Sequence, residues 1–381
     1  MTESDSSASP PDYDSLFAND NNHIDNTISS TTSTPLPHNR KIYFTYPATQ
    51  NSFQKGFLGV EDASICGTLH LRYSLARPLL ATKITLAFTG KLKIEFEQSP
   101  LNFNSTRLKS EKIYKDQTIY SETLDLWSSA LHGEFQEIDR LDLPFQFDLP
   151  ANLEPTISLK PENQFYNVYY TLKATIHQKP DFWRLQRKVI NLKINCPLDR
   201  YSKPPTPWQI DNSAHYLSSY DDEEAISRGI GYDLSLAQRK TPLNSKLNAT
   251  LNLIFHDARI NLKKILCILE ERYVIGADGI TSKLNKREVT CASVKGTAIA
   301  ILPGLKNESC VQIAVEVPGK DKVFCSMKTS NVQIRHFLKV LLKLGNADDV
   351  ELETEIKIIN PTININANAT IDEQLPSYQV I

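Results

Sequence analysis

The chain has 381 residues, which is long enough for two domains that each bury a core of their own. Its apolar content of 40% and charged content of 23% are typical of a globular protein and exclude a wholly disordered or membrane-embedded chain. The net charge of −2 gives no overall field that would attract nucleic acid, so we expect no nucleic-acid partner.

The two ends of the chain are polar. Residues 1–38 are mainly Ser, Thr, Asn, Asp and Pro, and residues 366–381 have a similar composition. Such segments cannot bury enough apolar surface to offset the entropy lost on ordering, so we expect disordered tails. The first residues do not resemble a secretory signal, and no apolar run is long enough for a membrane-spanning helix. Six scattered cysteines without a C-x-x-C pair indicate buried thiols in a reduced, cytoplasmic protein.

Between the tails, apolar and polar residues alternate with a period of two, which predicts half-buried strands. In "TLHLRYSL" the alternation predicts that Leu69, Leu71, Tyr73 and Leu75 share one face and that His70 is exposed. Thr89-Gly90 interrupts the next long run and predicts a turn or a bulge. Three further alternating segments follow: "LDLPFQFDLP", "NVYYTLKATIH" and "VINLKINC". We expect residues 39–198 to form the first domain.

The pattern then breaks over residues 199–227, a segment with several prolines and the acidic run "DDEE", which we interpret as a linker or surface loop. Alternation resumes over residues 228–365, which we expect to form the second domain. "RHFLKVLLKL" also fits helical spacing, but its longer period-two run favours a strand with His336 facing inward. The sequence therefore predicts an all-β chain of two tandem antiparallel β-sandwiches with disordered tails.

The sequence contains no recognisable catalytic or cofactor site. The eight histidines form no H-x-H, H-E-x-x-H or Cys/His group, so we expect no bound metal. Asp278-Gly279 is a favoured hairpin dipeptide and predicts a turn rather than a phosphate-binding loop. Gly229 and Gly231 precede a strand, which does not fit a dinucleotide-binding motif. The interpretation is a protein that is not an enzyme, with no cofactor.

Several segments, in the same order, resemble those of arrestins. "SICGTLHLRYSLARPLLATKITLAFTG" is similar to the opening of an arrestin N-terminal domain, with G-x-L-x-L, a Pro-Leu turn and a strand ending in F-x-G. "LPFQFDLPANLEP" and "NVYYTLKATIHQ" resemble its following strands, and "VQIRHFLKVLLKL" is similar to a strand of the arrestin C-terminal domain. The resemblance extends over about residues 40–365 and is closest to α-arrestins of the fungal kind, the arrestin-related trafficking adaptors.

Each predicted tail carries a proline–tyrosine (PY) motif. The N-terminal motif is P-P-x-Y, and the C-terminal one is the weaker L-P-x-Y: Pro10, Pro11, Tyr13, Leu375, Pro376 and Tyr378. In a polyproline II helix with three residues per turn, the tyrosine returns to the face of the first proline, and both fit the aromatic-lined grooves of a WW domain. These six residues are the predicted binding site.

The resemblance to fungal α-arrestins implies the partners and the function. It implies that the motifs bind a HECT-type ubiquitin ligase with WW domains. The sandwiches would hold cytosolic tails of membrane transporters or receptors, which are then ubiquitinated and endocytosed. We therefore expect a cytoplasmic adaptor recruited to the plasma membrane or endosomes, with peripheral membrane association only. The alternative is a retromer-like or other trafficking scaffold of the same fold that does not engage a ligase.

Overall fold

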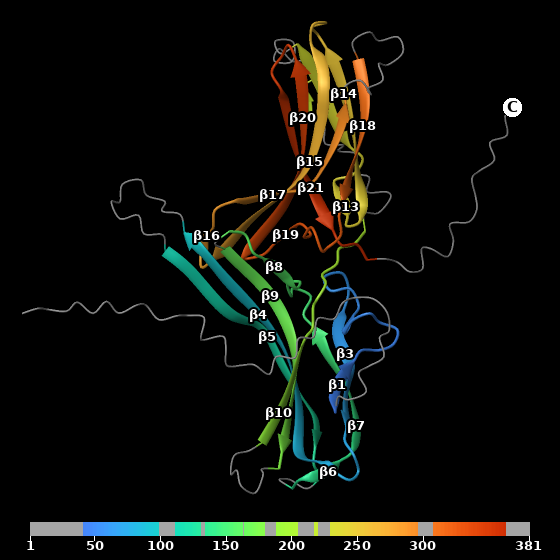
Figure 1. Cartoon of the computed structure of the whole chain (residues 1–381), viewed down its shortest axis with the longest axis vertical. Helices are drawn as coiled ribbons and strands as arrows, with labels where there is room; N and C mark the ends of the chain where they lie inside the picture. The colour runs from blue at the N-terminus through green and yellow to red at the C-terminus, as the bar shows by residue number, and fades with distance from the viewer. Residues whose placement is uncertain are drawn as a thin grey trace, which may run out of the picture. The chain divides into compact units, whose positions relative to one another are not determined.

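The structure is a computed structural model that describes most of the chain between residues 41 and 362 (Figure 1). The described ranges are 41–98, 111–130, 134–162, 164–179, 188–204, 217–219, 229–295 and 308–362. All described residues belong to one compact unit. Among the described residues, no helix is long and apolar enough to cross a membrane.

The first sandwich consists of two mainly antiparallel sheets. One sheet contains β1 (Ile42–Thr45), β2 (Gln54–Lys55), β3 (Ala63–Arg72) and β7 (Arg140–Leu149). The other sheet has the order β10-β9-β4-β5, and two short strands extend it: β6 pairs with β4, and β8 pairs with β9. The bounds of its strands are β4 (Leu79–Gln98), β5 (Glu111–Ser128), β6 (Gln136–Ile138), β8 (Ile157–Leu159), β9 (Gln164–Gln178) and β10 (Lys188–Asn195). Figure 1 shows the long β4 lying between β5 and β9.

The second sandwich repeats this two-layer plan. One sheet has the order β11-β12-β14-β18: β11 (Leu217–Ser219), β12 (Ile230–Leu236), β14 (Ser245–Phe255) and β18 (Glu308–Val317). The other is built around β15 and β20: β13 (Lys240–Pro242), β15 (Asn261–Ala277), β16 (Ile280–Thr281), β17 (Asn285–Lys295), β19 (Met327–Lys328), β20 (Val332–Gly345) and β21 (Val350–Ile359). β13 pairs with β21 in parallel. The predicted fold class, tandem antiparallel sandwiches, is confirmed.

The apolar residues of the period-two pattern form the cores of the two sandwiches. Inward residues of β4 and β9 are completely or almost completely buried, as alternation predicts for strands with one face in a core: Ile84, Leu86, Phe88, Leu92, Ile94, Phe96, Val168, Tyr170, Leu172, Ala174 and Ile176. A second cluster fills the other sandwich from β12, β14, β15, β18, β20 and β21. Five side chains of β15 and β20 are instead buried with the first cluster: Tyr273, Ile275, Ala277, Val332 and Ile334.

Several local predictions can be compared with the structure. The interruption at Thr89-Gly90 is a bulge, because the register between β4 and β5 shifts at Gly90/Lys91 while the strand continues. "RHFLKVLLKL" lies in β20, as predicted. Asp278 and Gly279 both have positive φ angles, +52° and +83°, in the turn between β15 and β16. The predicted linker contains β11, which pairs with β12. The predicted domain boundaries themselves stay predictions.

Two predictions in the β3 segment are wrong. Leu75 is 83% exposed because β3 ends at Arg72 and the chain turns before β4, so the alternation no longer places a residue on the inner face. His70 is half-buried rather than exposed, since the rings of Tyr43 and His70 stack with their centroids 4.8 Å apart. A neighbouring strand therefore covers part of the outer face of β3.

The six cysteines are free in the structure, as the sequence indicated, but only Cys196 and Cys267 are fully buried. Burial raises the pKa of the Cys196 thiol to about 12, and burial likewise raises that of Cys267 to about 12. Cys291 is exposed. The prediction of buried thiols therefore holds for part of the set.

Gly90 gives a test of the core. A Cβ atom on Gly90 would lie 2.4 Å from Cε1 of Tyr170, a ring that is itself buried. We expect Gly90→Ala to lower the free energy of unfolding by about 1–3 kcal/mol, because the ring must leave its packed position. Urea unfolding measures this, with Thr89→Ala as the control on the outer face of the same strand. Equal stability of Gly90→Ala and wild type would contradict this packing.

Candidate functional site

A cleft of about 1660 Å³ is lined by residues of both sandwiches. The first sandwich contributes residues 152–157 and 199–202, and the second contributes segments around β13, β19, β20 and β21. Pockets for small molecules usually measure about 300–1,000 Å³. The cleft is therefore large enough for a segment of polypeptide.

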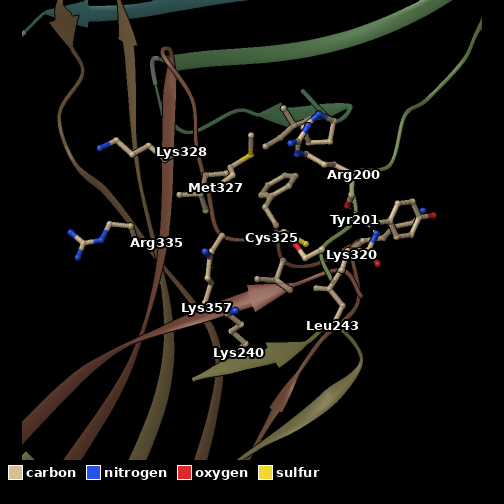
Figure 2. Close-up of a pocket in the computed structure, with 18 of the residues that line it drawn as sticks. Arg200, Tyr201, Lys240, Leu243, Lys320, Cys325, Met327, Lys328, Arg335 and Lys357 are labelled. Carbon is tan, nitrogen blue, oxygen red and sulfur yellow. Dashed lines mark hydrogen bonds between the residues drawn. The ribbon is translucent and has the colours of Figure 1, made fainter. Parts of the chain in front are cut away.

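The lining of the cleft is strongly cationic. The lining contains seven basic side chains and three carboxylates, and Figure 2 shows several of the basic ones around the cavity. The basic residues are Arg200, Arg239, Lys240, Lys320, Lys328, Arg335 and Lys357, and the acidic residues are Glu154, Asp199 and Glu355. At neutral pH this composition favours an anionic occupant.

Three of the seven cations form ion pairs or hydrogen bonds with other groups of the protein. The Nζ of Lys320 lies 2.9 Å from Oδ2 of Asp199, and this hydrogen bond raises the pKa of Lys320. Arg335 forms a two-pronged ion pair with Glu355, with Nε 2.9 Å from Oε1 and Nη2 on the other oxygen. Arg200 donates through Nη1 to the carbonyl oxygens of residues 151 and 153, at 2.7 and 2.8 Å. These contacts fix the walls of the cleft.

The other four cations have no ion pair among the described residues: Arg239, Lys240, Lys328 and Lys357. Lys240 and Lys357 are register partners in the parallel β13–β21 pair, so two like charges lie side by side. Like charges directly opposite each other destabilise a sheet. The Nε of Arg239 is buried and has no hydrogen-bond partner in the described part of the chain. An anionic chain in the cleft would supply partners for these groups.

The strap, residues 319–328, forms one wall of the cleft and is anchored by a buried carboxylate. Glu271 on β15 is 0% exposed, and strand register places it between Arg287 on β17 and His336 on β20. Its Oε1 accepts from Nη2 of Arg287 at 2.7 Å, and its Oε2 accepts from the backbone N–H of Phe324 at 3.0 Å. Arg287 also donates to the carbonyl oxygen of Lys322 at 3.0 Å.

His336 extends the same network to the other end of the strap. Its Nε2 lies 3.3 Å from Oε2 of Glu271, and its Nδ1 lies 2.8 Å from Oγ of Ser326. The Ser326 hydroxyl in turn accepts from the backbone N–H of Ile358 at 2.9 Å. A neutral imidazole that accepts from Ser326 and donates to Glu271 satisfies every group. His336 thus faces inward, as the sequence predicted, and both of its ring nitrogens have partners.

Glu271 was not among the residues predicted from the sequence, although its position in the alternating pattern could have indicated it. In "ILCILEERYVIG" every second residue of β15 points inward, and these include Cys267, Leu269 and Tyr273. Glu271 occupies the inward position between Leu269 and Tyr273. A carboxylate at an inward position of an alternating strand must have partners, because an unpaired buried charge is very costly. Those partners come from strands distant in sequence, so alternation alone does not name them.

A second polar network lies on the outer face of β1, β3 and β7. His70 contacts Oδ1 of Asp142 through Nδ1 at 2.6 Å and Oγ1 of Thr45 through Nε2 at 2.8 Å. The hydrogen bonds from His70 and then Arg72 hold the pKa of Asp142 below its usual range. The order Thr–His–Asp resembles a hydrolytic triad. The three residues lie on adjacent strands, so the network joins β1, β3 and β7, and none of the three lines the cleft.

The predicted binding residues lie outside the described part of the chain. Both PY motifs fall there: Pro10, Pro11, Tyr13, Leu375, Pro376 and Tyr378. Among the described residues, no group of three or more His, Cys, Asp and Glu side chains is placed to hold a metal ion.

Comparison with known families supports the resemblance seen in the sequence. Residues 57–194 match the family model described as the N-terminal domain of arrestin (or S-antigen). No curated protein matches the chain. The matched range corresponds to most of the first sandwich, from before β3 to the end of β10. The match and the tandem sandwiches support an arrestin-fold protein.

The network around Glu271 predicts a measurable effect on the strap. Glu271→Leu leaves the buried His336 ring and the backbone N–H of Phe324 without their acceptor, and a buried polar group left unpaired costs about 1–3 kcal/mol of stability. Burial raises the pKa of Cys325, inside the strap, to about 12. We expect Glu271→Leu to increase the rate of Cys325 alkylation in the folded protein, as measured by site-resolved mass spectrometry.

Glu271→Gln is the matched control, because an amide keeps the shape and can still accept the N–H of Phe324. We expect Glu271→Gln to label Cys325 more slowly than Glu271→Leu does. Unchanged labelling in Glu271→Leu, at a denaturant concentration where it remains folded, would show that the carboxylate does not hold the strap.

Proposed function

We propose that this protein is an α-arrestin of the fungal type, a non-catalytic adaptor that recruits a WW-domain HECT ubiquitin ligase to membrane transporters or receptors. Ubiquitination of the bound cargo then promotes its endocytosis. The observation that carries the proposal is the arrestin N-terminal domain match over residues 57–194 in a chain of two tandem sandwiches. The protein acts in the cytoplasm and is recruited to the plasma membrane or endosomes.

The ligase binds the PY motifs. In P-P-x-Y the prolines are pre-set near the polyproline II conformation, so little entropy is lost when they enter the first groove of a WW domain. The tyrosine ring fills the second groove. The L-P-x-Y motif binds more weakly because Leu375 does not restrict φ as a proline does. When a ligase has several WW domains, two weak sites on one chain raise the overall affinity by about 10² or more.

The cargo binds in the cleft through an acidic cytosolic segment. Four cations without ion pairs among the described residues line the cleft, and three of them are lysines on β13, β19 and β21: Lys240, Lys328 and Lys357. Placing carboxylates between Lys240 and Lys357 removes the repulsion within this register pair. The anchored strap keeps this wall in place before the cargo arrives, which lowers the ordering cost of binding.

The ligase part of the proposal is tested with isolated WW domains. We expect Tyr13→Ala together with Tyr378→Ala to weaken binding of the full chain about thirtyfold or more, because each change removes the aromatic anchor of a motif. Isothermal titration calorimetry gives the affinity. Tyr114→Ala is the matched control, since Tyr114 is 64% exposed on β5 and lies in neither motif. Unchanged binding by the double variant would refute this part.

The cargo part is tested with a synthetic peptide rich in Asp and Glu. We expect Lys240→Glu and Lys357→Glu each to weaken peptide binding several-fold, and wild-type binding to fall steeply with salt, because the contacts are electrostatic. Fluorescence anisotropy measures both effects. Lys55→Glu, an exposed reversal on β2 outside the cleft, is the control. Salt-independent binding, or equal loss in all three variants, would place the peptide elsewhere.

A further inference from the structure

A second cationic surface lies on the open face of the β10-β9-β4-β5 sheet, on residues that do not line the cleft. Lys173 on β9 and Lys193 on β10 are register partners, and both are exposed. The same row continues to Ala87 on β4 and Thr123 on β5. Two positive charges therefore lie on adjacent strands in a row that contains no carboxylate.

The neighbouring rows do not compensate these charges. Apart from Asp125 on β5, they contain hydroxyl and amide side chains: Thr85, Thr89, Ser121, Thr171, Thr175, Asn191 and Asn195. The nearby carboxylates of Asp125 and Asp116 are paired with Lys83 at 2.8 Å and Lys93 at 3.7 Å.

Lys91, Lys173 and Lys193 form what we call the lysine tract. None of the three has an ion pair within the described ranges, although the same face holds several paired lysines. Opposed like charges cost stability. A single acidic residue at either position of the Lys173–Lys193 pair would replace this repulsion by attraction. The sheet instead keeps a local excess of positive charge, which an external anionic partner would neutralise.

The arrangement of the tract favours a planar partner. Its lysines lie on three strands, β4, β9 and β10, rather than along one strand edge. None of the three lines the cleft. A bilayer containing anionic lipids presents a plane of negative charges, and each lysine close to that plane strengthens binding about fivefold.

We propose that the lysine tract lies against anionic lipid headgroups and holds the first sandwich on the membrane surface. This contact is separate from the cleft and does not depend on cargo or ligase binding. Because each lysine adds little, three lysines give weak and reversible attachment that is sensitive to salt. Such attachment would concentrate the chain at membranes without fixing it there.

Sedimentation of the full chain with phosphatidylcholine vesicles, with and without phosphatidylserine, tests the proposal. We expect wild type to bind only the vesicles with phosphatidylserine, and Lys173→Glu with Lys193→Glu to bind them at least 30-fold more weakly. The control is Lys55→Glu with Lys203→Glu, two exposed lysines outside the tract, which should bind as wild type. The proposal fails if phosphatidylserine makes no difference or if the two double variants bind alike.

The single variant Lys173→Glu separates binding from folding. It places opposite charges in the register pair, so we expect its thermal unfolding midpoint to be at or above that of wild type, while vesicle binding falls. A lower midpoint together with weaker binding would point to misfolding and count against the tract. A soluble Asp- and Glu-rich peptide provides the last comparison. If Lys173 and Lys193 are required for this peptide but not for phosphatidylserine vesicles, the partner is a protein and the proposal is wrong.

Discussion

The geometry of the cleft depends on the buried carboxylate of Glu271. One oxygen accepts from Arg287, and the other accepts from the backbone of Phe324 and lies 3.3 Å from His336. The three strands β15, β17 and β20 are thereby tied to the strap that forms one wall of the cleft. Without that carboxylate, a buried histidine and an arginine would lack their partner, and the strap would lose a backbone contact. A polar network inside a β-sandwich therefore supports one wall of the cleft.

Lysines oppose each other across neighbouring strands at several places in the described structure, and two of these pairs carry the proposals. Lys240 and Lys357 line the cleft, and Lys173 and Lys193 lie on the open sheet of the first sandwich. Neither pair has a carboxylate partner among the described residues, whereas Lys83, Lys93 and Lys339 on the same sheets do. Residues that bind a partner often cost the free protein some stability, and the proposals assign an acidic segment to one pair and anionic lipid to the other.

The sequence predicts the fold class and many of the core residues, because alternation of apolar residues directly reports which face of a strand is buried. It fails at Leu75, where the strand ends before the pattern does, and at His70, where a neighbouring strand covers the outer face. The cleft could not be predicted, since its cations come from segments between residues 200 and 357 that only strand pairing brings together. Conversely, the PY motifs are visible only in the sequence, and they lie outside the described residues.

The central claim is that one chain connects an acidic cargo segment to a ligase, and a bridging assay tests it most directly. An immobilised acidic peptide from a transporter tail is incubated with the full chain and a soluble tandem WW protein, and capture of the WW protein is measured. We expect capture only when the chain is present, with loss when either the cleft lysines Lys240 and Lys357 are reversed to Glu or Tyr13 and Tyr378 are changed to Ala. Capture that persists in both variants would contradict the account.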